Sequence, residues 1–143
     1  MNRRFAKRLP TTKGRVNRTE FLAYLFVYGL AFLILSVPLA YLPEAVTPVG
    51  TGVLLVSIAI LVGTLTIKRV HDFDESGWFA LLILIPIVNL YVIFVPGSEA
   101  PNRFGDSPPP ASLGLQLAAV ISLVWPVAII AAIMFVPDLR KYF

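Results

Sequence analysis

Three short polar stretches hold most of the residues in this chain that could do chemistry. They cover residues 14–21, 68–78 and 101–105, and long apolar runs separate them. The middle stretch contains the chain's single histidine, His71, close to Asp72, Asp74 and Glu75. Imidazole and carboxylate groups are the usual ligands of divalent metals and the usual acid–base catalysts. This stretch is therefore the first place to look for a metal site or a catalytic centre.

Neither kind of site is predicted here. A metal site lacks a second histidine, and the chain has no cysteine. Acidic residues at the head of a helix also have a structural role, because they cap free N–H groups and complement the helix dipole. The chain contains no Gly-x-Ser-x-Gly motif, and Ser76 before Gly77 is typical of a turn. We therefore expect no metal, no cofactor and no catalytic residue.

A network of ion pairs at a membrane interface explains these polar residues better. Arg69 can pair with Asp72 or Glu20, and Arg18 can pair with a neighbouring carboxylate. Such pairs can fix the register of helices, or they can form a pocket for a lipid phosphate or a partner's tail. We expect mutual satisfaction between helix ends to be the main role, with ligand binding as the alternative. The candidate residues are Arg15, Arg18, Glu20, Arg69, His71, Asp72, Trp78, Asn102 and Arg103.

The apolar runs between these stretches set the fold class. Residues 21–42, 50–67, 78–95 and 113–136 contain no Asp, Glu, Lys or Arg, and 57% of the chain is hydrophobic. As helices the runs would reach roughly 27 to 36 Å, which matches a hydrocarbon core of ~30 Å. Lipid leaves only helices or closed barrels, and the runs lack the alternation of barrel strands. The prediction is an all-α polytopic membrane bundle with four transmembrane helices.

Basic residues predict the orientation of the bundle. Seven of the twelve Lys and Arg residues precede the first run, and the loop 43–48 has none. If all four runs span, eleven basic residues lie on one side and one lies on the other. The positive-inside rule then places both termini in the cytoplasm. The first run has 22 residues, too many for the apolar part of a cleaved signal peptide, so we expect it to be retained.

The third run allows two paths. Pro86 and Asn89 interrupt it at mid-depth, so it is either a kinked spanning helix or a re-entrant hairpin. The hairpin would change the count of basic residues only to ten against two, so charge does not decide. We favour the spanning helix, because non-helical backbone in a membrane needs protein or water around it. A spanning helix would separate Arg103 from His71 by a bilayer, whereas a hairpin would bring all three polar stretches together.

Local signals mark the helix ends and faces. Asn17 and Glu20 form the pattern of a capping box ahead of the first run. Glu20, Tyr24 and Tyr28 share one face, and Pro38 is expected to bend or end that helix. Trp78 is expected to anchor the third run at the headgroup level. Small residues that could let helices approach closely are Ala59, Gly63, Gly114, Ala118 and Ser122.

The three polar stretches together resemble the domain of unknown function 805 family of small bacterial inner-membrane proteins. The matching residues are Gly14, Arg15, Arg18, Glu20 and Phe21; Arg69, His71, Asp72, Ser76, Gly77 and Trp78; and Asn102, Arg103, Phe104 and Gly105. The likeness covers roughly residues 13–108, with departures at Leu22 and at the acidic pair Asp74 and Glu75. It implies a multi-pass protein of the inner membrane, and it implies no activity.

This comparison divides the chain into three parts. Residues 1–13 form a basic cytoplasmic arm, residues 14–108 the family core with three transmembrane segments, and residues 109–143 an additional helix with a short basic tail. The arm is expected to be drawn to anionic headgroups, since each basic residue near such a surface contributes ~1 kcal/mol. An apolar bundle with a basic cytoplasmic edge needs no nucleic acid to explain its charge.

Three functions remain in competition. The favoured one is a non-enzymatic scaffold, lipid-headgroup binder or accessory subunit, acting alone, as a homo-oligomer or with a membrane-protein partner. The second is a small transporter or channel component, which would need an oligomer because the runs offer few polar groups at mid-depth. The third is a membrane enzyme for lipid-type substrates that uses Arg69, His71 and Asp72.

Overall fold

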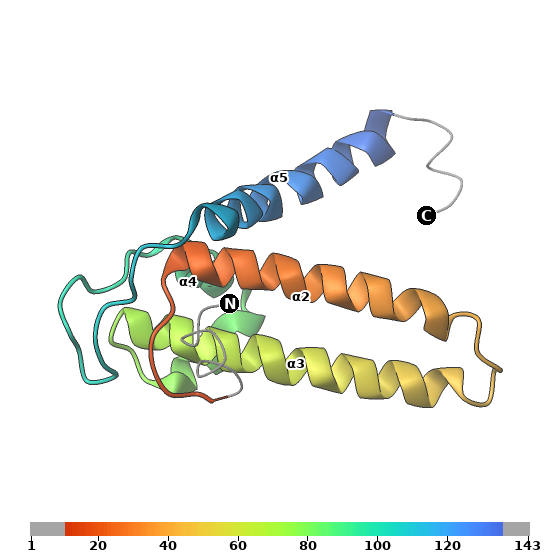
Figure 1. Cartoon of the computed structure of the whole chain (residues 1–143), viewed down its shortest axis with the longest axis horizontal. Helices are drawn as coiled ribbons and strands as arrows, with labels where there is room; N and C mark the ends of the chain where they lie inside the picture. Colours follow the sequence, from red (N-terminus) through yellow and green to blue (C-terminus); the bar gives the residue numbers. More distant parts are fainter. Residues whose placement is uncertain (1–10, 136–143) are drawn as a thin grey trace.

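A computed structural model describes residues 11–135 of this chain, and side chains up to residue 124. The described part is helical, without a β-strand (Figure 1). Its elements are α2 (Arg18–Leu39), α3 (Thr47–Asp72), the 3-10 helix η1 (Gly77–Leu84), α4 (Pro86–Phe94) and α5 (Leu113–Phe135). Most of the predicted basic arm and the whole basic tail lie outside the described residues.

Helices α2 and α3 form an antiparallel pair that makes up the long body of the protein (Figure 1). The predicted cap at the start of α2 is confirmed, because the Asn17 side chain accepts a hydrogen bond of 2.8 Å from the Glu20 N–H. The helix ends at Leu39, one residue after Pro38. The face shared by Glu20, Tyr24 and Tyr28 turns inward, and the rings of the two tyrosines stack with centroids 6.3 Å apart.

The buried residues gather at one end of this helix pair. In α3 every buried residue lies from Thr64 onward, and in α2 every buried residue lies in the first half. The apolar core there consists of Val16, Phe21, Tyr28, Leu65, Val70 and Val92. Charged side chains are buried at the same end, so the interior of the protein contains both its apolar core and most of its predicted polar site.

The third apolar run does not cross from one end of the pair to the other. It consists of two short helices, η1 and α4, that join at Ile85. Ile85 is extended because it precedes Pro86, and a proline fits the first turn of the next helix. The Ser98 N–H donates to the Asp72 carbonyl over 2.8 Å, so the chain returns to the end of α3 from which it left. The prediction of a third spanning helix is wrong, and residues 77–94 form a hairpin.

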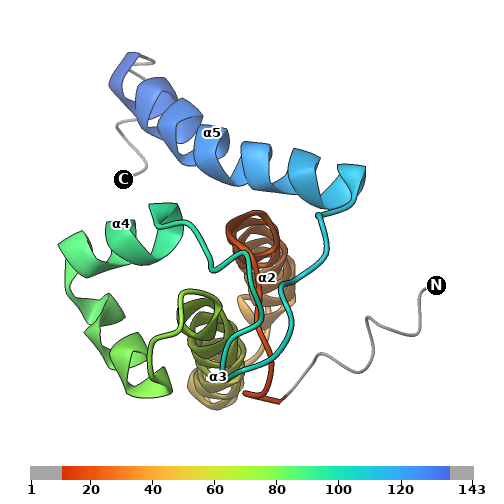
Figure 2. The same ribbon diagram turned by 90° about the vertical axis from the view of Figure 1, so that its left-hand side faces the viewer.

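Helix α5 lies against α2 on the side away from α3 (Figure 2). It starts at the same end as α2, where the Asn17 amide donates to the Pro109 carbonyl over 3.2 Å. From that end it runs in the same direction as α2 and diverges from it (Figure 1). Among its described side chains Ala119 is buried, whereas most others are exposed.

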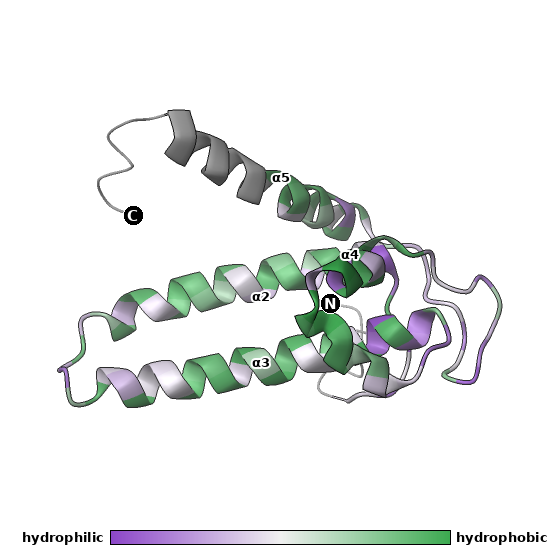
Figure 3. Ribbon diagram, turned by 180° about the vertical axis from the view of Figure 1, so that it is seen from behind, coloured by the Kyte–Doolittle hydropathy of each residue, from purple (hydrophilic) through white to green (hydrophobic). Residues whose placement is uncertain are grey.

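The far halves of α2 and α3 consist mainly of apolar residues (Figure 3), and many of their large side chains are exposed. Ile34, Val49 and Val53, for example, are 61%, 68% and 63% exposed. Both helices are long and apolar enough to cross a membrane, and only 11% and 17% of their most apolar windows are buried. A core helix of a water-soluble protein would be mostly covered. The two helices therefore suit a lipid environment.

Candidate functional site

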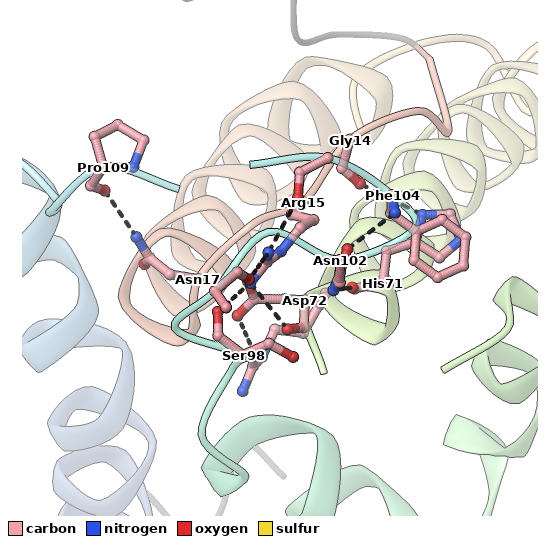
Figure 4. Close-up of polar contacts among 12 residues, drawn as sticks. Gly14, Arg15, Asn17, His71, Asp72, Ser98, Asn102, Phe104 and Pro109 are labelled. Carbon is pink, nitrogen blue, oxygen red and sulfur yellow. Dashed lines mark hydrogen bonds and ion pairs between the residues drawn. The ribbon is translucent and has the colours of Figure 1, made fainter. Parts of the chain in front are cut away.

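The three polar stretches of the sequence meet at the end of the α2–α3 pair where the core lies (Figure 4). The Val16 N–H donates to the Lys68 carbonyl over 3.2 Å, which ties the stretch before α2 to the end of α3. The Asn102 side chain donates to the His71 carbonyl over 2.9 Å, which ties the third stretch to the same place. The arrangement is the one that the hairpin alternative predicted.

The Asp72 carboxylate is the centre of this cluster. Its Oδ1 lies 3.2 Å from the Arg15 guanidinium, and its Oδ2 lies 2.7 Å from Arg69 Nη1. The three side chains are at most 3% exposed. The predicted pair of Arg69 with Asp72 is confirmed, and Arg15 is its second cation. Burial removes these charges from water, so only their mutual attraction and their hydrogen bonds within the protein can offset the lost hydration.

Arg15 uses the rest of its guanidinium to hold the segment that returns from the hairpin. Its Nη1 donates to the carbonyls of Ala100 and Gly105 over 2.9 and 3.2 Å. Its Nη2 donates to the carbonyls of Asp72 and Ser98. A guanidinium has five N–H donors, and the contact from Nε to the Asp72 carboxylate completes the set. Arg15 therefore fastens the returning segment to the end of α3.

Arg69 fastens the end of the hairpin to α3. Its side chain is fully buried, its Nε donates to the Val92 carbonyl over 3.0 Å, and its Nη2 donates to the Val95 carbonyl. The last carbonyls of a helix have no partner within the helix. Arg69 supplies one for α4, so the hairpin is held by a side chain from the last turn of α3.

Gly97 lets the returning chain pass next to Asp72. A Cβ atom at this position would lie 2.5 Å from the Asp72 Cγ and 2.9 Å from its Oδ1, closer than real Cβ contacts. Any larger residue would push the carboxylate away from its two arginines. The geometry of the ion triad therefore depends on a glycine at this position.

His71 has a structural environment. Its ring stacks on the Phe104 ring with centroids 3.7 Å apart and an angle of 4° between the planes. Its Nδ1 lies 3.4 Å from the Gly14 carbonyl. Within residues 11–135, no group of three or more His, Asp and Glu side chains could hold a metal ion. The histidine therefore joins the first and third polar stretches through packing.

Other predicted residues lie at the edge of the cluster. Arg103 pairs with Asp74 over 3.3 Å, but both side chains are more than half exposed. Trp78 is 79% exposed. Arg18 is exposed and makes no ion pair with any described residue, so the predicted pairing of Arg18 is wrong.

The small residues contribute little to packing inside one copy of the chain. Gly63 and Gly114 have no described atom of another element within 4 Å of an added Cβ, and Ala59 is exposed. The predicted close approach of helices at these positions is wrong for a single chain. Ala118 and Ser122 are partly buried, and their role in packing stays a prediction.

A cavity of about 270 Å³ opens beside the ion triad, between the start of α2, the end of α3 and the loop 104–108. Its charged lining residues are Lys13, Arg15, Glu20, Lys68 and Asp106. Val16, Tyr24, Leu65 and Pro108 supply its less polar wall. The cavity thus combines both signs of charge with an apolar surface, as a site for an amphipathic molecule does.

Several of these groups were not predicted from the sequence. Gly97, Ser98 and Ala100 act through backbone space or a carbonyl, which residue type does not reveal. Lys68 and Asp106 line the cavity, and Lys68 is only 3% exposed. From the sequence we used Lys68 only to predict the orientation, although its neighbour Arg69 was already a candidate for the ion-pair network.

Comparison with known proteins decides the family. The family described as "Protein of unknown function (DUF805)" matches residues 9–106, which is more than half of the chain. The chain belongs to this family. The prediction from the three polar stretches is confirmed, and the matched region ends ahead of α5.

Two curated proteins from Escherichia coli (strain K12) are similar to this chain. Inner membrane protein YhaH is 32% identical over 111 residues, which cover 67% of this chain and 85% of YhaH. Inner membrane protein YhaI is 28% identical over 99 residues, which cover 66% of this chain and 83% of YhaI. No solved structure matches the chain. Relatives of this DUF805 protein are thus inner membrane proteins, in accord with the two apolar helices.

The Gly97→Ala variant tests the close approach to Asp72. We expect it to lower the free energy of unfolding in mild detergent by about 1–3 kcal/mol, because overpacking displaces the carboxylate. Gly52→Ala is the matched control, since Gly52 lies in α3 with nothing within 4 Å of an added Cβ. Equal stabilities of the two variants would show that Asp72 can move at no cost.

The Asp72→Asn variant tests the buried triad against the exposed pair. Removal of its charge leaves two arginines without an anion, so we expect a loss of roughly 3–5 kcal/mol in the free energy of unfolding. Asp74→Asn removes the charge of the exposed pair and should cost less than about 1 kcal/mol. Asn also tolerates the positive φ of 62° at this position. Denaturation in SDS measures both, and a similar loss in each would contradict the central place of Asp72.

Proposed function

We propose that this chain is a multi-pass protein of the inner membrane that binds the phosphate of a lipid headgroup at its cytoplasmic end, without catalysing a reaction. The observation that supports this function is the cavity beside the ion triad, where lysines and apolar side chains line one space. A lipid at the membrane surface presents a phosphate next to glycerol and acyl carbons, so it needs both kinds of wall.

The lengths of the helices support three crossings and one shallow hairpin. With 22, 26 and 23 residues, α2, α3 and α5 would extend about 33, 39 and 35 Å. Each length exceeds a hydrocarbon core of ~30 Å. The eight residues of η1 reach only about 16 Å and the nine of α4 about 14 Å, roughly half of that core. The hairpin then enters and leaves through one leaflet.

The exposed tip of the hairpin supports the same topology. Leu84 is 86% exposed and Ile87 is 70% exposed, on either side of the joint between η1 and α4. Such side chains are stabilised by contact with acyl chains. The non-helical part of the tip is short, because only Ile85 is extended between the two helices, and η1 packs against α3.

Charge gives the orientation of this topology. In sequence order, ten basic residues, which include Arg103, belong to the connections on the side of the ion triad, at the end that the positive-inside rule concerns, and two follow α5. The positive-inside rule assigns the first end to the cytoplasm. With three crossings, the C-terminus then lies outside the cytoplasm, opposite to the expectation from four spanning helices.

Binding fits the polar groups better than catalysis does. The five N–H donors of Arg15 are engaged by four carbonyls and the Asp72 carboxylate, and Arg69 donates to the same carboxylate and to two carbonyls. His71 is stacked on Phe104 and is only 8% exposed. Polar side chains that bond to one another stabilise the fold. Catalysis needs at least one acid, base or nucleophile directed at a substrate.

Single cysteines test the topology, because the natural chain has none. Thr11, Glu44 and Ser107 are exposed in loops. We expect Thr11→Cys and Ser107→Cys to react with a membrane-impermeant maleimide only from the cytoplasmic side, and Glu44→Cys only from the other side. A reporter fused after Phe143 should be active outside the cytoplasm. Labelling of Ser107→Cys from the side of Glu44→Cys would restore the four-helix topology.

Lys13 tests lipid binding at the cavity. It is exposed at the wall of the cavity, so Lys13→Gln should leave the fold intact. A basic residue near anionic groups contributes ~1 kcal/mol, so we expect about fivefold weaker binding of phospholipid. Native mass spectrometry of the detergent-purified protein, with lipid added back, measures the bound fraction.

Arg18→Gln is the matched control for Lys13→Gln. It removes the same charge from an exposed residue that does not line the cavity. Lipid binding at the cavity requires that only Lys13→Gln weakens it. An equal loss of lipid affinity in both variants would show that the effect comes from the overall positive charge at this end of the protein and not from the cavity.

A further inference from the structure

A second space, a groove of about 460 Å³, lies between the end of α3 and the start of η1. Gly63 and Ile67 of α3 and Leu81 of η1 form its apolar part. His71 and Ser76 contribute polar groups at its other part. None of the described residues that line this groove is Lys, Arg, Asp or Glu. The groove therefore suits a ligand without charge, because no side chain in its wall offers a counter-charge.

His71 presents one ring nitrogen without a partner to this groove. Its Nδ1 lies 3.4 Å from the Gly14 carbonyl, which can only accept a hydrogen bond, so Nδ1 carries the hydrogen and Nε2 of the neutral ring is an acceptor. Among the described residues Nε2 has no hydrogen-bond partner. It lies at the groove wall, 3.4 Å from a Cβ atom added at Gly77. Because the His71 side chain is only 8% exposed, a hydrogen-bond donor on a ligand would satisfy a buried acceptor.

The polarity of the groove changes along its length. On α3, His71 lies eight residues after Gly63, which is about 12 Å along the helix axis. On the other wall, Ser76 precedes η1, and Leu81 lies inside η1 toward the tip of the hairpin. In both walls the polar residue lies at the end that holds the ion triad, and the apolar residue lies deeper in the proposed membrane. A ligand that follows the groove therefore has a small polar head and an apolar tail.

The head of this ligand has to donate a hydrogen bond. A phosphate or a carboxylate would direct acceptor oxygens at the lone pair of His71 Nε2, and an ammonium would find no carboxylate in the wall. A hydroxyl group donates to Nε2, and its oxygen accepts from a second donor. Ser76 offers such a donor, since its side chain makes no capping bond to η1. A neutral lipid with a free hydroxyl, such as diacylglycerol, has both this head and an apolar tail.

We infer that the groove between α3 and η1 binds a neutral lipid through its free hydroxyl, which donates to His71 Nε2, while the hydrocarbon tail lies along Ile67 and Leu81. No described residue lines both this groove and the cavity beside the ion triad. The site is therefore additional to the proposed phospholipid site, and either one can fail without the other. No charged residue of the groove is available to assist a reaction, so the contact with the hydroxyl is one of binding.

The test compares dioleoylglycerol with its methyl ether, which keeps both acyl chains and loses only the hydroxyl hydrogen. Each lipid is added to the full chain in detergent, and native mass spectrometry gives an apparent affinity. We expect dioleoylglycerol to bind about fivefold more tightly, which is the effect of one net hydrogen bond. Equal binding of the two lipids, or no binding of either, overturns the inference. A dimer that binds neither lipid would assign the groove to a second copy of the chain.

Gly77→Ala tests the place of binding. The added methyl group would lie 3.3 Å from Ile67 Cγ2 and 3.4 Å from His71 Nε2, so it occupies the groove where the hydroxyl binds. We expect at least fivefold weaker binding of dioleoylglycerol. Gly52→Ala is the matched control, because Gly52 lies outside the groove and an added Cβ meets nothing within 4 Å. Lys13→Gln, at the other cavity, should also leave this binding unchanged. Unchanged affinity in Gly77→Ala overturns the inference.

His71→Phe tests the hydrogen bond itself. It keeps a ring to stack on Phe104 and removes both ring nitrogens. We expect dioleoylglycerol and its methyl ether to bind this variant equally, because their ratio depends on Nε2, whereas a role in packing alone would change both affinities together. A surviving preference for dioleoylglycerol contradicts the assignment to His71. Thermal unfolding in detergent shows whether the variant is folded, and if it is not, the result for Gly77→Ala decides.

Discussion

The ion triad of Arg15, Arg69 and Asp72 is the interaction on which this architecture depends. A carboxylate with almost no exposure must have cations and donors around it, since removal from water costs several kcal/mol per ion. Here the two arginines come from different parts of the chain, and each also holds carbonyls of a third part. The buried Asp72 charge requires cations close to it. Because these cations come from the stretch before α2 and from α3, and also bind the end of the hairpin, the triad connects all three parts of the chain. An apolar core of the same volume could not direct so many backbone carbonyls to one place.

The position of this triad suits a protein whose surroundings change from water to lipid within a few residues. Apolar burial gives little net stability to helices in lipid, because acyl chains are as apolar as the side chains. In agreement, the far halves of α2 and α3 bury no side chains fully, while the end that holds the triad buries both apolar and charged ones. Hydrogen bonds and ion pairs keep their value at such an interface, where competition from water is reduced. The fold is therefore closed by polar contacts at one end, and its apolar surface is left for lipid.

The sequence was sufficient for several features that depend on local pattern, although it placed Asp72 at the head of the next helix, whereas Asp72 is the last residue of α3. The start of α2 followed from the cap at Asn17, and the family followed from three polar stretches taken jointly. Asp72 was one of two carboxylates expected to pair with Arg69, and the structure selects it. The path of residues 77–94 did not follow, because Pro86 is compatible with a kink as well as with a chain reversal. The chain reversal is stabilised by hydrogen bonds from Arg15 and Arg69 to main-chain carbonyls of the returning segment. Every residue has such a carbonyl, so the sequence does not reveal which ones are bound. Gly97 was not predicted either, because its role is to leave space for the Asp72 carboxylate, and the sequence does not show which glycine lies next to that side chain.

The closed triad and the open cavity are two parts of one arrangement. Arg15 cannot serve a ligand, yet its bonds to the carbonyls of Ala100 and Gly105 fix the loop that carries Phe104 and Asp106. Asn102 adds a bond from the same loop to the end of α3. The position of the cavity wall thus depends on Arg15 and Asn102, whose hydrogen bonds go to other residues of the protein. A substitution in the triad would alter binding through the loop, and a substitution of Lys13 or Asp106 would alter it directly. Stability and binding can therefore be separated at the cavity wall but not at the triad.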